Sequence, residues 1–372
     1  MKKVAISLVM LGMILGFSVP AILAGEGKIG GNLKLYLWDQ SGGTSNGDVR
    51  DDRGTPGISS LYMYISRELN EKVSIDVQPT ISVSTRATPR IGTKIGAQRT
   101  ATSVSVGFVK AYLKCLLPYN VEISAGVIRP LFTEDYGAQL FYEEELHGNC
   151  ASANSRLGEW KDFGAELYKV FEVENVSIPA YLYFLNGNNY ATDDNNAKMV
   201  MFHLAPEVNL GNFGGLKVMG SIATGMYDTN TVPIKPVIRY SAGLAYTWRN
   251  LWVRGEYMNG TWSSWTEGKG WTDGVARDIL TNGYYVKVGY NITPKLRIIV
   301  DRAVSVYNYY QDAAGKYVQS PETTMQWIPS INYFITEDSI LIFQYIIHDA
   351  WRDDGNASLH YSRGTLGWRT TF

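Results

Sequence analysis

The sequence predicts an all-β fold, a transmembrane antiparallel β-barrel of about sixteen strands. Three observations lead to this prediction. Apolar and polar residues alternate along many segments, short turns alternate with much longer loops, and the last segment, 359–372, ends on an aromatic residue inside such an alternation. An even strand number, short turns on one side and longer loops on the other are typical of outer-membrane barrels.

The first 24 residues have the pattern of a secretory signal peptide. Lys2 and Lys3 form a basic start, an apolar run follows, and Pro20 precedes Ala24, a small residue suited to cleavage. We therefore expect one domain, residues 25–372. After Ala24 no uninterrupted apolar run reaches the roughly 18 residues of a transmembrane helix. Membrane insertion is expected as β-structure, which also satisfies the backbone polar groups in lipid.

Composition agrees with a membrane barrel. The 25 Tyr, 10 Trp and 37 Gly residues suit strands, interface belts and turns. Without Lys2 and Lys3, 32 of the 34 basic residues remain against 35 acidic ones, a formal charge of about −3 that does not indicate nucleic-acid binding. With two cysteines, Cys115 and Cys150, the chain is not a disulfide scaffold, and we do not expect them to pair.

Each strand is predicted from the period of two. Near the N-terminus Leu33 and Leu35 alternate with Lys34, and in the clearest case Val73 and Ile75 begin an alternation that continues for about a dozen residues. A polar, glycine-rich stretch at 41–57 is expected to be a loop. The predicted strands are 28–38, 58–69, one that starts at 73, 102–117, 121–131, 161–172, 176–186, 198–210, 214–226, 235–248, 251–259, 280–291, 295–307, 322–335, 339–348 and 359–372.

The connections between these strands are asymmetric. Seven are tight turns and eight are longer loops, of which 132–160 is the longest. A barrel with both termini on one side needs this arrangement, with the short turns periplasmic and the loops extracellular. A secreted β-sandwich shows the same alternation, because the period does not say whether the apolar face points into a core or into lipid. Strand length, loop asymmetry and the terminal strand favour the barrel.

The last strand resembles the C-terminal strand of bacterial outer-membrane β-barrels. Leu366, Trp368 and Phe372 match that pattern and are predicted to be an assembly signal, whereas Thr370 stands where an aromatic residue is usual. Across the whole chain, strand number and loop order resemble those of the sixteen-stranded general porins. This resemblance implies a homotrimer in the outer membrane of a Gram-negative-type bacterium.

Charged residues on the polar faces of the strands are predicted to line the inside of the barrel. A barrel of this size has a lumen too wide for side chains to fill, so an aqueous channel follows. The predicted wall acids are Asp76, Glu122, Glu166, Glu207, Glu256 and Asp301. The predicted basic wall residues are Lys34, Arg86, Lys110, Lys114, Lys217, Arg239, Arg254, Lys287, Arg297, Arg363 and Arg369. This excess of basic residues predicts a weak anion preference.

The third long loop, 132–160, combines apolar residues with a group of carboxylates. We expect it to fold inward, with its aromatics on the wall and its carboxylates toward the channel; the alternative is a solvated outer loop. In the general porins that the chain resembles, the third loop narrows the channel, although the Pro-Glu-Phe-Gly-Gly type signature of some of them is absent here. The predicted constriction acids are Glu134, Asp135, Glu143, Glu144 and Glu145.

The expected function is passive diffusion of small hydrophilic solutes and ions through a channel in outer-membrane lipid. One alternative is a porin selective for phosphate or another anion, and a second is a plugged structural or surface-recognition barrel. The sequence contains no convincing grouping of Ser, His and acid, and no phosphate-loop or dinucleotide fingerprint. The four histidines show no metal-ligand spacing; His147 and Cys150, three residues apart and near Glu144, could bind a metal, but loop His and Cys residues often lie this close by chance. We expect no enzyme activity, cofactor or metal.

Overall fold

The computed structural model describes residues 27–45, 48–53, 57–87, 100–137, 144–152, 158, 160–187, 198–227, 235–264, 277–307, 310–311, 317–318, 322–352 and 358–371. The predicted signal peptide lies outside them. In these ranges no helix has the length and apolar character to cross a membrane.

The main strands are β1 (Gly27–Ser45), β2 (Asp48–Arg53), β3 (Gly57–Asn70), β4 (Val73–Ala87), β5 (Thr100–Leu117), β6 (Val121–Ile128), β7 (Asp162–Val173), β8 (Val176–Leu185), β9 (Met199–Leu204), β10 (Glu207–Asn209), β11 (Gly215–Tyr227), β12 (Lys235–Trp248), β13 (Leu251–Ser264), β14 (Arg277–Thr293), β15 (Leu296–Tyr307), β18 (Glu322–Thr336), β19 (Ser339–Arg352) and β20 (Ser358–Thr371).

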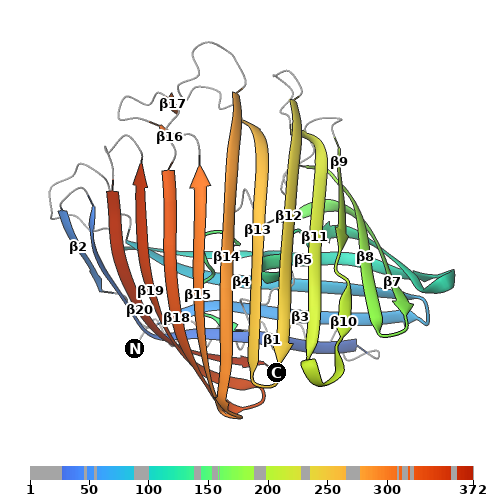
Figure 1. Ribbon diagram of the computed structural model, residues 1–372, viewed down its shortest axis with the longest axis horizontal. Helices are drawn as coiled ribbons and strands as arrows, with labels where there is room; N and C mark the ends of the chain where they lie inside the picture. The colour runs from blue at the N-terminus through green and yellow to red at the C-terminus, as the bar shows by residue number, and fades with distance from the viewer. Residues whose placement is uncertain are drawn as a thin grey trace.

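These strands form one antiparallel sheet that closes on itself. β1 pairs with β3 along one edge and with β20 along the other, from Asn32↔Thr371 to Ser45↔Leu359. β9 and β10 lie end to end between β8 and β11, and among the described residues β2 pairs with β1 alone. Sixteen strands therefore cross in the described part of the chain, and the predicted fold class is confirmed. In Figure 1 strands β11 to β20 stand side by side at the front, while β1, β3, β4 and β5 cross behind them.

The seven predicted tight turns are all present. They lie at 71–72, 118–120, 174–175, 211–213, 249–250, 294–295 and 337–338, and two of them are single 3₁₀ turns, Pro118–Asn120 and Gly211–Phe213. Figure 1 shows these turns along the lower and right-hand rim. Glu174 and Arg249 adopt positive φ values of 51° and 52°, as tight hairpin turns require.

Several segments differ from the prediction. β6 ends at Ile128 instead of 131, and the predicted strand 198–210 is interrupted after Leu204 and resumes at Glu207. β1 continues to Ser45 and pairs with β2 in the stretch that the sequence predicts to be a loop. β13 and β14 are also longer than predicted and pair out to Ser264↔Arg277. Both extensions lie at the loop-side ends of strands, where polar and glycine residues predominate although Trp262 and Ile279 are apolar. The hydrophobic alternation stops there, but backbone pairing does not need it.

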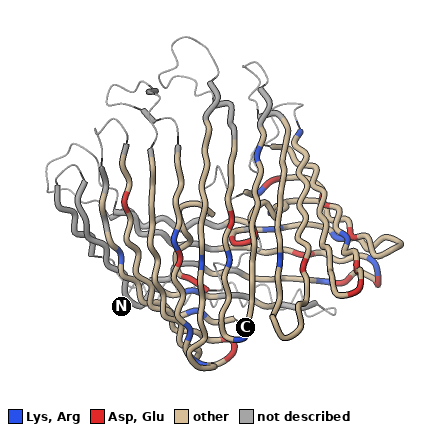
Figure 2. The backbone as a smooth tube through the Cα atoms, viewed as in Figure 1, with Lys and Arg blue, Asp and Glu red and all other residues tan. Residues whose placement is uncertain are grey.

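The faces of the sheet are inverted relative to those of a water-soluble protein. In β14 the apolar and aromatic residues Tyr284, Val286, Val288 and Tyr290 are 38–50% exposed, whereas Lys287 between them is fully buried. The outside of the sheet is therefore apolar, and the inside carries the charges. Figure 2 shows that charged residues are sparse along the described strands. This pattern excludes the alternative β-sandwich, whose apolar faces would be buried together.

Candidate functional site: the loop inside the barrel

The segment after β6 folds into the barrel and contacts the inner faces of many strands. At its start, the Phe132 carbonyl accepts hydrogen bonds from the hydroxyls of Ser221 on β11 (2.9 Å) and Ser241 on β12 (2.7 Å). The backbone N–H of Leu131 donates to the Tyr183 hydroxyl on β8 at 3.3 Å. Wall side chains thus satisfy backbone groups that the loop would otherwise bury unpaired.

A single helical turn, α2 (Glu134–Gly137), follows. The Glu256 carboxylate on β13 accepts from the backbone N–H groups of Glu134 at 2.9 Å and Asp135 at 3.4 Å. The hydroxyl of Tyr285 donates to the same carboxylate at 2.5 Å. A carboxylate beside the free N–H groups of a first turn is a stabilising arrangement, so the wall holds this turn in place.

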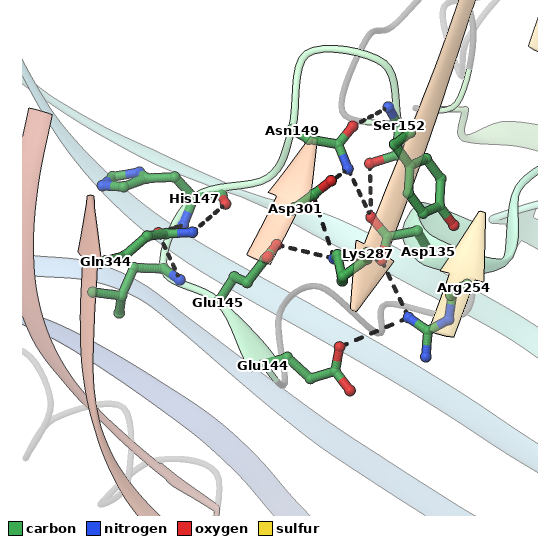
Figure 3. Close-up of polar contacts among 12 residues, drawn as sticks. Asp135, Glu144, Glu145, His147, Asn149, Ser152, Arg254, Lys287, Asp301 and Gln344 are labelled. Carbon is green, nitrogen blue, oxygen red and sulfur yellow. Dashed lines mark hydrogen bonds and ion pairs between the residues drawn. The ribbon is translucent and has the colours of Figure 1, made fainter. Parts of the chain in front are cut away.

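A buried ion cluster joins the loop to strands β14 and β15. The Lys287 ammonium lies 2.9 Å from Asp135 Oδ1, 3.0 Å from Glu145 Oε2 and 3.8 Å from Asp301 Oδ2. All four side chains are fully buried. Figure 3 shows Lys287 and Asp301 on the wall, with Asp135 and Glu145 reaching them from the loop. One wall cation therefore binds two carboxylates from separate parts of the loop.

Further ion pairs surround this cluster. Arg254 on β13 lies 3.4 Å from Asp135 and 3.7 Å from Glu144, and Arg297 on β15 lies 3.9 Å from Glu144. On β11, Lys217 pairs with Glu134 at 2.6 Å and with the wall residue Glu207 at 2.9 Å. Four predicted wall cations thus contact four of the five predicted constriction acids. The cations are Lys217, Arg254, Lys287 and Arg297, and the acids are Glu134, Asp135, Glu144 and Glu145.

Asn149 holds the returning part of the loop against the cluster. Its Nδ2 donates to Asp301 Oδ2 at 2.8 Å, and its Oδ1 accepts from the backbone N–H groups of Ala151 (3.0 Å) and Ser152 (2.8 Å). The Ser152 hydroxyl in turn donates to Asp135 at 2.8 Å. These bonds supply Asp135 and Asp301 with donors besides Lys287, which lowers the cost of burying them.

Amide side chains of the next strands of the wall, β18 and β19, bind the loop backbone. Gln344 on β19 accepts from the N–H groups of Leu146 (3.2 Å) and His147 (2.8 Å), and donates to the His147 carbonyl at 3.1 Å. On β18, Gln326 accepts from Cys150 N–H at 2.7 Å, and Asn332 donates to the carbonyl of Glu144 at 2.8 Å. The Lys34 ammonium on β1 donates to the Glu145 carbonyl. The loop is thereby attached on both sides of the barrel.

Apolar contacts complete the attachment. Leu146 packs with Ile340 and Ile342 on the inner face of β19. A second cluster groups Phe132, Ala151 and Trp160 of the loop with inward residues of the wall, among them Tyr183, Leu185, Met199, Met201, Met258 and Tyr285. Gly367 on β20 makes room for Leu146, because a Cβ there would lie 2.5 Å from Leu146 Cδ2.

The two loop carboxylates on Lys287 have opposite pKa shifts. Burial works to raise the pKa of Asp135, but Lys287 and Arg254 beside it hold it below its usual range. Burial raises the pKa of Glu145 well above its usual range, and the nearby charges of Asp301 and Asp135 act in the same direction against Lys287. Asp135 is the charged partner of Lys287, and Glu145 is the carboxylate that resists ionisation.

The remaining predicted basic residues lie on the same inner face. Lys114 pairs with Glu122 at 2.5 Å, and Lys110 is on the same face of β5. The Arg239 guanidinium lies 4.6 Å from the ring centre of the loop residue Trp160. Arg363 and Arg369 share the face of Gly367, which contacts Leu146. The side chain of Arg86, and Glu143 and Phe372, lie outside the described part of the structure.

Two features of the loop differ from the sequence prediction. Asp135 and Glu145 do not face water, because both are fully buried against wall residues. The amides Gln326, Asn332 and Gln344, which attach the loop, were not predicted. Their signal in the sequence is a polar, uncharged side chain on the inward face of a strand, which does not distinguish an attachment point from an ordinary wall residue. Among the described residues the two cysteines, Cys115 and Cys150, form no disulfide.

Nothing matches this chain among protein-family models or curated sequences. Solved structures with a similar fold include the anion-selective porin from Comamonas acidovorans (TM-score 0.57, 10% identity, 93% of this chain and 99% of that one). Others are the outer membrane channel DcaP of Acinetobacter baumannii (0.56, 13%, 94% and 98%) and a trimer form of OmpT, an outer membrane protein of Vibrio cholerae (0.52, 9%, 94% and 99%). At these identities the likeness shows the fold alone. The fold is that of bacterial outer-membrane porin barrels, as the sequence resemblance predicted.

Proposed function

We propose that this protein is a porin of a Gram-negative-type outer membrane, a water-filled channel through which small hydrophilic solutes and ions diffuse passively. The observation that carries the proposal is the inverted sheet. Its outer face is apolar and suits lipid, and its inner face carries paired and clustered charges that suit water. The channels and porins among the solved structures of similar fold agree with this function.

The loop 132–160 is the part of this proposal that sets the width of the channel. Sixteen strands enclose a lumen that wall side chains alone do not fill. The loop is attached to β1, β13, β14, β18 and β19 by buried polar contacts, so it occupies part of that lumen as a fixed constriction. Passive diffusion needs no chemical step, and the proposal includes neither a reaction nor a cofactor.

A weak anion preference is part of the proposal. Lys217, Arg254, Lys287 and Arg297 pair with carboxylates of the loop, so their charges are largely neutralised. The preference is then expected to be small, and to come from the excess of basic over acidic residues on the inner wall as a whole. Selectivity for phosphate or another anion is the alternative, in which these residues would act as successive binding points.

We also propose that the protein assembles as a homotrimer, like the OmpT trimer form, with Leu366, Trp368 and Phe372 as its assembly signal. Chemical crosslinking of the purified protein in detergent micelles would count the subunits. A single band at the mass of one chain would contradict the trimer.

Single-channel recording of the purified protein in a planar lipid bilayer tests the proposed function. Large ohmic steps are expected. In a salt gradient the reversal potential should be shifted slightly from zero toward the equilibrium potential of the anion. Small steps that saturate with one anion would instead indicate the selective porin. A second candidate, a barrel plugged by the loop, is favoured by how completely the loop attachments are buried. The absence of any steps would contradict both channel functions and support the plug.

A further inference from the structure

Arg302 is a charged residue on the apolar outer face of the barrel. Along β15, Ile299 and Asp301 are buried on the inside, while Ile298 and Val300 are 39% and 37% exposed on the outside. Arg302 lies two residues after Val300 in the same strand, so its side chain is on the same outer face. The residues that pair with Arg302 on the two neighbouring strands also face outward, which confirms its position on the outer face.

The surroundings of Arg302 are apolar and aromatic. It pairs across the sheet with Val286 of β14 and Trp327 of β18, which are 46% and 41% exposed. Tyr284, two residues before Val286, is also exposed, and Arg302 lies five residues before the loop-side end of β15 at Tyr307. Arg302 is therefore near the loop-side edge of the apolar belt, where exposed Trp and Tyr residues gather, as they do at membrane interfaces.

No carboxylate neutralises Arg302 within the described residues. Its guanidinium lies 4.3 Å from the ring centre of Trp327, and it donates to the sulfur of Met325 at 2.8 Å. An outward acid, Asp349 of β19, is one strand further on and forms an ion pair with His360 of β20. The described residues thus supply Arg302 with a stacking surface but with no counter-charge.

From this geometry we infer that Arg302 binds the phosphate headgroup of a membrane lipid in the leaflet on the loop side. An unpaired charge facing hydrocarbon is unfavourable, and an arginine relieves this cost by extending its head to the interface while its stem stays on apolar surface. Arginine and phosphate form strong, often bidentate, hydrogen bonds. The inference rests on the proposed membrane placement, but not on conduction.

A lipid fits this position better than a second copy of the chain. The partners of Arg302 across the sheet, Val286 and Trp327, are exposed apolar groups that would face acyl chains. Trp327 also stacks on the guanidinium, as an interfacial tryptophan does beside a headgroup. Asp349 on the same face is hydrogen-bonded to His360 of β20 and lies two strands away from Arg302, so within one chain it is not the partner of Arg302.

The test compares lipid binding by the full-length protein and two variants. Arg302→Met removes the charge and keeps an apolar stem of similar length. Arg249→Met is the matched control, because Arg249 also stacks on a tryptophan, Trp248 at 4.8 Å, but lies in an exposed turn. Native mass spectrometry in detergent would measure binding of phosphatidylglycerol and phosphatidylcholine. We expect Arg302→Met to weaken phosphatidylglycerol binding about fivefold, equivalent to about 1 kcal/mol for one basic side chain near an anionic surface, and Arg249→Met to leave it unchanged.

A second readout keeps the inference testable even if the binding change is small. In phosphatidylcholine vesicles Arg302→Met should unfold at the same or a higher temperature than the wild type, because an unpaired charge has been removed from the lipid face. Adding phosphatidylglycerol should stabilise the wild type and not the variant. Equal stabilisation of both proteins would overturn the inference.

Two other outcomes would assign Arg302 a different ligand. If inorganic phosphate alone stabilises the wild type as much as phosphatidylglycerol does, and only when Arg302 is present, the ligand is free phosphate. If Arg302→Met dissociates an oligomer in lipid-free detergent without changing lipid binding, the partner is a second copy. Conductance of the wild type in a bilayer tests the channel separately, so a silent channel that still binds lipid through Arg302 would contradict only the proposed function.

Discussion

Replacing Lys287 with methionine removes the cation that joins two parts of the loop to the wall. In the wild type, Lys287 lies 2.9 Å from Asp135 and 3.0 Å from Glu145, and the three side chains are fully buried. Without Lys287 the nearest cation to Asp135 is Arg254 at 3.4 Å, and Asp301 loses its cation within 4 Å. Removing one partner of a buried pair costs about 3–5 kcal/mol, because the remaining charges are left unpaired.

The expected result is a released loop in a barrel that still forms, since strand pairing does not depend on Lys287. Single-channel steps should become larger or noisier, and a protease added from the loop side should cleave the loop faster. The midpoint of denaturant unfolding should fall by an amount that corresponds to a loss of about 3–5 kcal/mol in the free energy of unfolding.

Lys114→Met is the matched control. Lys114 is also an inner-wall lysine and lies closer to its partner, 2.5 Å from Glu122, but these side chains are 34% and 29% exposed. An exposed pair contributes less than about 1 kcal/mol. If the two variants lose equal stability, or if Lys287→Met conducts like the wild type, burial of the cluster is not what holds the loop and the reasoning is wrong.

Three further predictions follow from the same contacts. Glu145 has a raised pKa when the loop is docked, so its contribution favours docking at low pH and is lost as the pH rises through that raised value; Glu145→Gln should make the conductance less dependent on pH between the ordinary carboxyl pKa and the raised one, and an unchanged pH profile would contradict this. Gly367→Ala should displace Leu146, whose Cδ2 lies 2.5 Å from the added Cβ, and should speed proteolysis of the loop; the same Cβ lies 2.9 Å from the Leu35 carbonyl oxygen of β1, so the unfolding temperature of the barrel should also fall. Arg363→Gln should shift the reversal potential toward cations while the unfolding temperature stays the same; an unshifted potential would remove Arg363 from the ion path.

Most of the fold could be predicted from the sequence because its signals are local. The alternation around Lys34 and along the strand that begins at Val73 places each side chain on one face of a strand, whatever the partner strand is. The seven turns are short enough to be recognised between alternating segments. The β1–β2 hairpin could not be predicted in this way, since residues 41–53 are polar on both faces and pair through their backbone.

The site was predictable in its components and not in its arrangement. The sequence indicates that residues such as Glu134 and Asp135 are carboxylates in a loop beside aromatics, and that Lys287 and Arg254 face inward. It does not indicate that these groups meet, because Asp135 and Lys287 are 152 residues apart in the chain. Nor does it identify Gln344, whose role depends on reaching the backbone of Leu146 and His147, nearly 200 residues earlier in the chain.

The sequence by itself therefore determined an inverted, closed sheet of sixteen strands, because periodicity, turn length and strand number are properties of the chain read in order. Only the tertiary structure decided which charges neutralise one another. It turned Asp135 and Glu145 from expected channel-facing acids into buried anchors on Lys287, and it placed Arg302 on the outer face with no counter-charge in the described part of the chain. The physical reason is that ion pairing and burial depend on distances across the barrel, which the order of residues does not contain.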